Sequence, residues 1–135
     1  MNNLLEIKRH KNKPDQPFFI YWPTVLVHWP FVPTPDSPPG GSRERIGKYD
    51  GQNGGVEYFD DMILYMDKLI GKMTQQLEAS GVSDNTLVLF TGDNGCATNI
   101  VSQMGKTQIH GGKGSMADAG THVAMIASGP GLIKG

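Results

Sequence analysis

The stretch Thr86-Leu-Val-Leu-Phe-Thr-Gly-Asp-Asn-Gly95 decides the fold that we expect for this chain. Leu87 to Phe90 is a short, unbroken apolar run, which is typical of a strand buried on both faces of a parallel sheet. Ligands of open parallel sheets bind beyond the carboxyl ends of the strands, and Asp93 and Asn94 follow at that point. Their oxygen atoms suit a hard cation such as calcium, although Asp-Asn-Gly is equally a common turn signal. On these residues alone, both interpretations stay open.

A long amphipathic helix precedes this stretch. Apolar residues recur every three or four positions, and Gly81 suits a C-terminal cap, so the pattern predicts a helix over residues 56–80. The recurring residues are Val56, Phe59, Ile63, Met66, Ile70, Met73 and Leu77. We expect this stripe to pack on the sheet. Four acidic residues are expected on a solvated face: Glu57, Asp60, Asp61 and Asp67.

The remaining elements complete an α/β pattern. Residues 1–13 resemble the end of a helix, residues 17–22 predict a buried strand, and residues 122–127 predict another. Strand, loop, helix and strand in this order form a βαβ unit, which predicts a mostly parallel sheet flanked by helices. Because the first element begins in mid-pattern, we expect residues 1–135 to form a single partial domain whose N-terminal strands lie outside this sequence.

A proline-rich segment over residues 24–41 carries His28. Prolines at this density exclude a helix or a central strand, so a loop leaving the strand at 17–22 is expected. His28 is either a functional imidazole or a solvated side chain, and Pro30-Phe-Val-Pro33 also has the spacing of a proline-rich partner peptide. The polar residues 42–55 are expected to continue the loop.

Lys113 lies between glycines, at positions 111, 112 and 114, in a predicted loop over residues 95–120. Glycines let backbone approach an anion closely and the ammonium adds charge, although an exposed lysine on a flexible loop fits as well. If the predicted strands are adjacent, Asp93, Asn94, His28 and Lys113 converge on one sheet edge. A metal, a cation and an imidazole around one point suit an ester of a tetrahedral oxyanion.

Composition excludes several classes of protein. The 135 residues have a net charge of −1, so no basic footprint for nucleic acid is present. No apolar run approaches the roughly 20 residues needed to span a bilayer. The single cysteine, Cys96, excludes an internal disulfide and is interpreted as a small buried side chain.

Three motifs together resemble the sulfatase family, of arylsulfatase-like type. They are Phe18-Phe-Ile-Tyr followed by His28-x-Pro30-x-x-Pro33, the segment Leu77 to Gly95, and Gly111-Gly-Lys-Gly-Ser-Met-Ala-Asp-Ala-Gly120. The resemblance runs from about residue 17 to residue 131. It implies an α/β fold of the alkaline-phosphatase superfamily and hydrolysis of a sulfate ester, in a small molecule or a sulfated glycan.

The resemblance also implies site roles. Asp93 and Asn94 would be calcium ligands, and His28 and Lys113 would contact the sulfate or its leaving oxygen. The family's nucleophile is a formylglycine made from a cysteine in a Cys-x-Pro-x-Arg motif, which this sequence lacks. We therefore expect a part of the catalytic domain that is inactive alone, from a parent that is exported, periplasmic, extracellular or lysosomal.

The sequence departs from the family pattern after the lysine. The family has Glu-Gly-Gly-x-Arg where this chain has Asp118-Ala-Gly-Thr-His122. Two alternatives to a sulfatase remain: a phosphoesterase or phosphonate hydrolase of the same superfamily, and a non-catalytic scaffold that self-associates through an exposed sheet edge.

Overall fold

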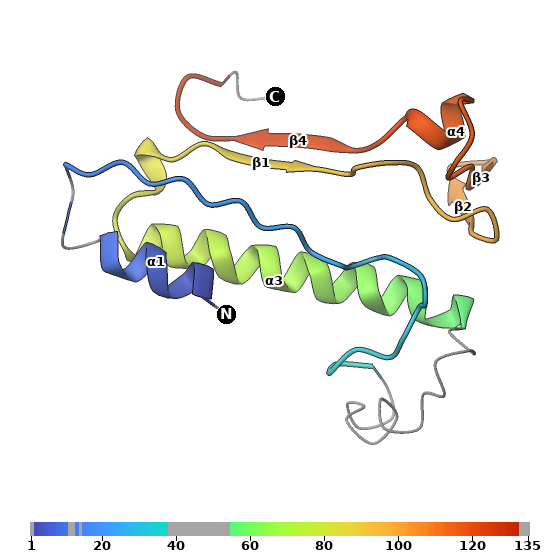
Figure 1. Ribbon diagram of the computed structural model, residues 1–135, viewed down its shortest axis with the longest axis horizontal. Coiled ribbons are helices and arrows are strands. Elements are labelled where there is room, and N and C mark those ends of the chain that lie inside the picture. Colours follow the sequence, from blue (N-terminus) through green and yellow to red (C-terminus); the bar gives the residue numbers. More distant parts are fainter. Residues whose placement is uncertain (1, 11–12, 14, 38–54, 133–135) are drawn as a thin grey trace. The chain divides into compact units, whose positions relative to one another are not determined.

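The computed structural model describes residues 2–10, 13, 15–37 and 55–132 (Figure 1). These residues divide into two compact units, Met1–Thr86 and Leu87–Gly135. The loop predicted over residues 42–55 lies outside the described residues, except for Gly55. None of the helices in the described ranges combines the length and the apolar character that a membrane crossing requires.

Helices dominate the first unit. It contains α1 (Asn2–His10), the short 3-10 helices η1 (Val56–Tyr58) and η2 (Ser83–Asn85), and the long helix α3 (Phe59–Ala79). The helix predicted over residues 56–80 is therefore confirmed, with its first turn in 3-10 form. Its end follows from Gly81, whose φ of 70° is accessible to glycine without strain. The N–H of Val82 then donates to the carbonyl of Leu77 at 3.1 Å, which satisfies a carbonyl of the last turn.

The core of the first unit joins α1, α3 and the proline-rich loop. Ile7 of α1 and Phe31 of the loop are each 1% exposed. On α3, the buried apolar side chains are Phe59, Met62 and Leu77. The predicted stripe is only partly buried, since Ile63 is exposed, and its packing on a sheet stays a prediction.

The strand predicted over residues 17–22 is wrong. These residues are extended but belong to no strand, and they run along α3 in the opposite direction (Figure 1). Phe19 is 90% exposed and Tyr21 is 76% exposed, so the run is not buried either. The physical reason is that a strand needs a hydrogen-bonding partner, and none of the described residues pairs with this segment.

The second unit contains a two-stranded antiparallel ribbon. In it β1 (Val88–Thr91) pairs with β4 (Met125–Ser128), with Val88 opposite Ser128 and Thr91 opposite Met125. Two strands were expected here, but the mostly parallel sheet is not confirmed, because every strand pairing among the described residues is antiparallel. Burial on both faces is also wrong for β1: its side chains alternate between half-buried and exposed. A single neighbouring strand leaves both faces of the ribbon to be covered by other elements.

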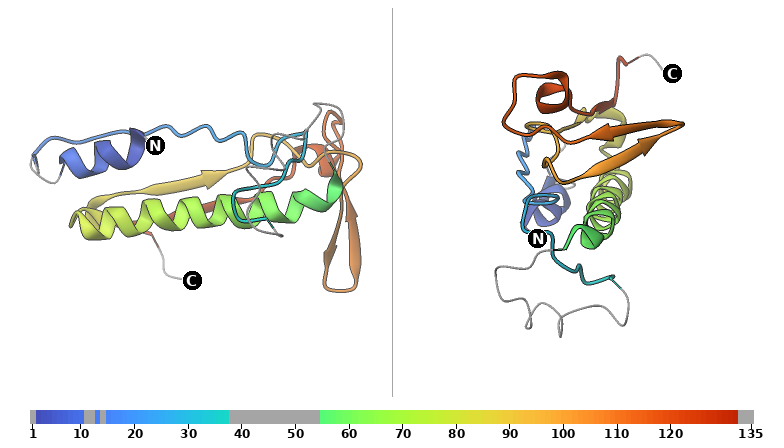
Figure 2. Two further views of the ribbon diagram at one scale, coloured as in Figure 1. Left: turned by 90° about the horizontal axis from the view of Figure 1, so that it is seen from below. Right: turned by 90° about the vertical axis from the view of Figure 1, so that its right-hand side faces the viewer.

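A β-hairpin lies inside the segment that we expected to be loop. It consists of β2 (Val101–Met104) and β3 (Thr107–His110), and a short helix, α4 (Asp118–Thr121), follows it. Gly105, with a φ of 60°, supplies the left-handed residue of the tight turn. Within the second unit, the hairpin projects sideways from the β1–β4 ribbon (Figure 2).

Candidate functional site

The acid–amide turn follows β1 directly. Asp93 is exposed and Asn94 is half-buried. The turn is held at Gly95, whose N–H donates to the carbonyl of Gly120 at 2.9 Å. A Cβ on Gly95 would lie 2.0 Å from the carbonyl oxygen of Ala119, so only glycine allows this approach. The turn therefore has a fixed place against α4, and its two polar side chains stand at the end of the strand.

The lysine loop is fastened to the same turn. The N–H of Lys113 donates to the carbonyl of Cys96 at 2.8 Å, and the N–H of Gly111 donates to that of Ile100 at 2.9 Å. Gly111 and Gly112 would clash if they carried a Cβ, with Ala97 and Ala119 respectively. The glycines were expected to admit an anion. Among the described residues, the missing side chains of Gly111 and Gly112 make room for Ala97 and Ala119, whereas a Cβ on Gly114 would meet open space, and access of an anion to this loop stays a prediction.

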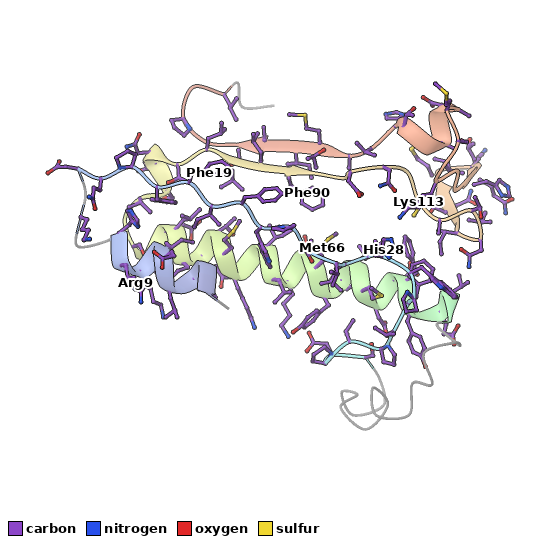
Figure 3. All side chains as sticks on the ribbon, in the orientation of Figure 1. Arg9, Phe19, His28, Met66, Phe90 and Lys113 are labelled. Carbon is purple, nitrogen blue, oxygen red and sulfur yellow. The ribbon has the colours of Figure 1, made fainter. Side chains whose placement is uncertain are left out.

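The second unit thus brings three of the four candidate residues into one neighbourhood. The hydrogen bond from Lys113 ends on a residue only two positions beyond Asn94. Lys113 is exposed, at the end of the unit that carries the hairpin and α4 (Figure 3). An acid, an amide and an ammonium are therefore presented from adjoining backbone segments.

His28 belongs to the first unit, on the extended segment beside the N-terminal half of α3 (Figure 3). Its Nδ1 lies 2.5 Å from the carbonyl oxygen of Trp29. Because a carbonyl only accepts, Nδ1 must carry a proton, which leaves Nε2 as the nitrogen directed to other partners. The convergence of His28 with the three residues of the second unit stays a prediction.

The loop that carries His28 is anchored to α3. Phe31 packs edge-on against Phe59, with ring centroids 5.2 Å apart. The N–H of Val32 contacts Sδ of Met62 at 3.4 Å, and Lys68 forms an ion pair with Asp36 at 2.5 Å. The imidazole is thus carried by a segment with an apolar anchor, not by a free linker.

The donor set fits part of a calcium site. Calcium takes about six to eight oxygen ligands, and Asp93 and Asn94 supply at most about three. Among the described residues, none forms a hydrogen bond or an ion pair with the Asp93 carboxylate, so its oxygens are available. The described part of the chain also contains no cluster of three or more His, Cys, Asp or Glu residues that could hold a metal ion. Further ligands would have to come from elsewhere.

Two other side chains near the turn bear on the chemistry. Burial raises the pKa of the Cys96 thiol, and the backbone hydrogen bond at Ala97 opposes this only in part, so the thiol stays protonated and poorly nucleophilic. Asp118 and His122, two of the positions that depart from the family pattern, stand at the start of α4 and just after its end, with Nδ1 of His122 3.5 Å from Oδ2 of Asp118. Both are largely exposed, so this pair contributes little to stability.

The sequence has clear relatives. A family profile described as Sulfatase matches residues 1–135. The chain is 32% identical over 130 residues to an N-acetylgalactosamine-6-O-sulfatase of Bacteroides thetaiotaomicron, which covers 89% of this chain and 23% of that protein. It is 27% identical over 122 residues to arylsulfatase A of Homo sapiens, covering 90% of the chain and 22% of the relative. An N-acetylgalactosamine-6-sulfatase of Canis lupus familiaris is 28% identical over 137 residues, covering 98% and 23%.

The chain therefore spans less than a quarter of the length of these relatives. The family profile nevertheless covers it from end to end, and it implies an α/β fold like that of alkaline phosphatase. At family level, the chemistry is the hydrolysis of sulfuric esters. The resemblance in the three motifs and the match over the whole length agree: the chain belongs to the sulfatase family.

Proposed function

We propose that this chain contributes one part of a calcium-dependent site for the hydrolysis of sulfate esters. Asp93 and Asn94 act as metal ligands, and Lys113 and His28 contact the sulfate or the leaving oxygen. The observation that supports the proposal is the hydrogen bond from the backbone N–H of Lys113 to the carbonyl of Cys96, which joins the lysine loop to the backbone just after the acid–amide turn. Family membership supplies the reaction class.

Each side chain has a distinct task in this proposal. The ammonium of Lys113, on an exposed loop, pairs with a sulfate oxygen and offsets negative charge. Bound calcium would polarise the sulfate oxygens and lower the pKa of the attacking hydroxyl. His28 acts through Nε2, since Nδ1 is engaged with the carbonyl of Trp29. Neutral His28 can only accept a hydrogen bond at Nε2, so donation to a leaving alkoxide requires the protonated ring.

The nucleophile is the part that this chain does not provide. Its 135 residues contain no Cys-x-Pro-x-Arg motif, and the raised pKa of the Cys96 thiol argues against that residue as a substitute. We propose that a formylglycine of the complete catalytic domain attacks the sulfur, and that residues 1–135 alone bind substrate without turning it over.

The substrate class follows from the names of the relatives. Two of the three relatives above are named for N-acetylgalactosamine 6-sulfate chemistry and the third as an arylsulfatase. All three names specify sulfate esters, which favours a sulfatase over a phosphoesterase. We propose a sulfate ester of a sugar as the substrate. Self-association through a sheet edge stays a prediction.

Binding tests the site directly. Calorimetric titration of the chain with a 6-sulfated N-acetylhexosamine, with and without calcium, should show calcium-dependent binding. Asp93→Asn should weaken the calcium dependence, and Lys113→Gln should weaken sulfate binding at saturating calcium. Lys72→Gln, an exposed charge change on α3, is the matched control and should bind as the unaltered chain does. Equal effects of Lys72→Gln and Lys113→Gln would overturn the placement of the site.

A turnover assay tests whether the nucleophile lies outside this chain. We expect no hydrolysis of an aryl sulfate by the isolated chain above a control without protein. Calcium-dependent turnover that survives replacement of Cys96 by serine would mean that another residue of this chain is the nucleophile. Parallel titration with the matching phosphate ester checks the reaction class, and tighter binding of phosphate would favour the phosphoesterase alternative.

A further inference from the structure

The β2–β3 hairpin lies in the sequence between the acid–amide turn and the lysine loop of the candidate site. It begins five residues after Cys96 and ends three residues before Lys113, and the hydrogen bond between Lys113 and Cys96 closes its base. The bond from Gly111 to Ile100 adds a second tie at the same place. Whatever Lys113 binds therefore lies beside this hairpin, and no flexible linker separates the two.

The hairpin is unusually accessible and carries a one-sided charge. Every residue of β2 and β3 is exposed. Residues 95–117 include the cations Lys106 and Lys113 together with His110, but no carboxylate, although the whole chain has a net charge of −1. Asp93 and Asp118 flank this range, so the hairpin itself offers one ammonium, that of Lys106, which suits an anionic group of a ligand. The charge of Lys106 does not help to fold the hairpin, because this lysine forms no ion pair with any residue that the structure describes.

The strand register gives the hairpin two different faces. Gln103 pairs with Gln108 and Val101 with His110, so these four share one face. Ser102 with Ile109 and Met104 with Thr107 share the other. The first face therefore carries amide and imidazole groups, which suit the hydroxyl groups of sugars. Gln103 is already used by the turn, since its Nε2 donates to the carbonyl of Gly105 at 2.8 Å, which leaves Gln108 and His110.

Distance along the strand separates the turn from the lysine loop. A strand rises about 3.3 Å per residue, so Lys106 lies roughly 13 Å from His110. One sulfated sugar held at Lys113 cannot also reach Lys106, whereas a longer sulfated chain can. Gln108 and His110 thus lie along one face of the hairpin, and Lys106 lies in the turn at the end remote from Lys113.

We propose that the β2–β3 hairpin is a subsite for the continuing chain of a sulfated glycan. Lys106 pairs with an anionic group on a neighbouring sugar, and Gln108 and His110 donate or accept hydrogen bonds with the hydroxyl groups between. This proposal rests on the proposed function, because it assumes that Lys113 holds the sulfate that is to be cleaved. It makes the hairpin the element that distinguishes a glycan from a small aryl sulfate.

The test compares ligands of two lengths on the 135-residue chain with calcium present. Calorimetry with a singly sulfated monosaccharide and with a sulfated tetrasaccharide should give tighter binding of the tetrasaccharide. Lys106→Gln and Gln108→Ala should each weaken tetrasaccharide binding by roughly two- to fivefold, the size expected for exposed polar contacts, and leave monosaccharide binding unchanged. Lys106→Arg should restore binding.

A control within the same hairpin separates recognition from folding. Met104→Ser alters an exposed residue on the opposite face and should bind both ligands as the unaltered chain does. Amide chemical shifts of β2 and β3 establish that each variant keeps the hairpin. Unchanged tetrasaccharide affinity in Lys106→Gln and Gln108→Ala would overturn the proposal, as would equally tight binding of a single-stranded DNA oligonucleotide of the same charge.

The two proposals fail in different ways. If the chain does not bind the monosaccharide but its affinity for the tetrasaccharide still depends on Lys106, the proposed sulfate site is wrong. The hairpin then remains a glycan-binding surface. If monosaccharide binding depends on Lys113 but the tetrasaccharide binds no more tightly, the sulfate site is supported and the proposed subsite is wrong.

Discussion

The two units of this chain are organised by opposite means. In the first, side chains fill a core: Phe31 packs between Trp29 and Phe59, and Ile7 is buried on α1. In the second, glycines remove side chains so that backbone segments touch. Among the described residues of the second unit, Ile100 is the one apolar side chain that is fully buried.

This difference indicates which unit requires precisely positioned backbone atoms. A helical core tolerates small shifts as long as its volume is filled. The turn at Asp93 and the loop at Lys113 are joined through N–H groups and carbonyls, which fixes them to within the length of a hydrogen bond. The geometry of a candidate site would therefore depend on the second unit. The first unit contains the side-chain core and carries His28.

The largest expected effect is in the first unit. Phe31→Ala should lower the free energy of unfolding by about 3–5 kcal/mol, because a ring that is 1% exposed leaves a cavity between two aromatic neighbours. Urea denaturation followed by circular dichroism measures this. Phe19→Ala is the control: that ring is 90% exposed, so its loss should cost far less. Equal costs for both variants would show that Phe31 does not anchor the loop.

Gly95→Ala tests the second unit. The added methyl would lie 2.0 Å from a backbone oxygen that cannot rotate away, so we expect a cost of about 1–3 kcal/mol, the range for overpacking. Both tryptophans, Trp22 and Trp29, belong to the first unit, so fluorescence does not report on this change. Hydrogen exchange at the amides of Gly95 and Lys113 does, and faster exchange at both is the expected result. Protection as in the unaltered chain would mean that the close approach is not maintained in solution.

Local patterns predicted the helical part of the fold well. The three-to-four residue spacing of apolar residues and the glycine at 81 together predicted α3 and its end, because a helix and its cap are satisfied within a few residues of sequence. The hairpin was missed even though Gly105-Lys106 between two short runs is a typical two-residue turn. The glycines on either side of the hairpin favour a loop, and their pattern masks the short β-forming runs between them.

Pairing could not be predicted in the same way. An apolar run such as residues 17–22 indicates a tendency to be buried, but the partner of a strand depends on residues far away. The antiparallel partner of β1 comes from residues 125–128, after a hairpin and a helix have reversed the chain. In the candidate site, the order of motifs predicted that Lys113 would lie near Asp93 and Asn94. Which atoms of a ligand each would contact depends on groups that no local pattern contains.

A smaller effect of opposite sign is expected at Gly71 in α3. No atom lies within 4 Å of a Cβ built there, apart from the helix's own nearby backbone. Gly71→Ala should therefore raise the free energy of unfolding by about 0.5–1 kcal/mol, because alanine has less backbone entropy to lose in a helix. Set beside Gly95→Ala, the same substitution thus stabilises one unit and disrupts the other. A loss of stability in Gly71→Ala, measured by urea denaturation, would reveal a contact on that face of α3.

The smallest effect separates the two ways in which the loop of His28 is held to α3. The ion pair between Asp36 and Lys68 is short, but both side chains are 46% exposed, so solvent and salt screen it. Asp36→Asn should therefore cost at most about 1 kcal/mol, and less as salt is added. Lys68→Gln should cost the same, and the double variant should cost no more than either single change. A cost that approached that of Phe31→Ala would mean that charge, and not the buried ring, fixes the loop that carries the imidazole.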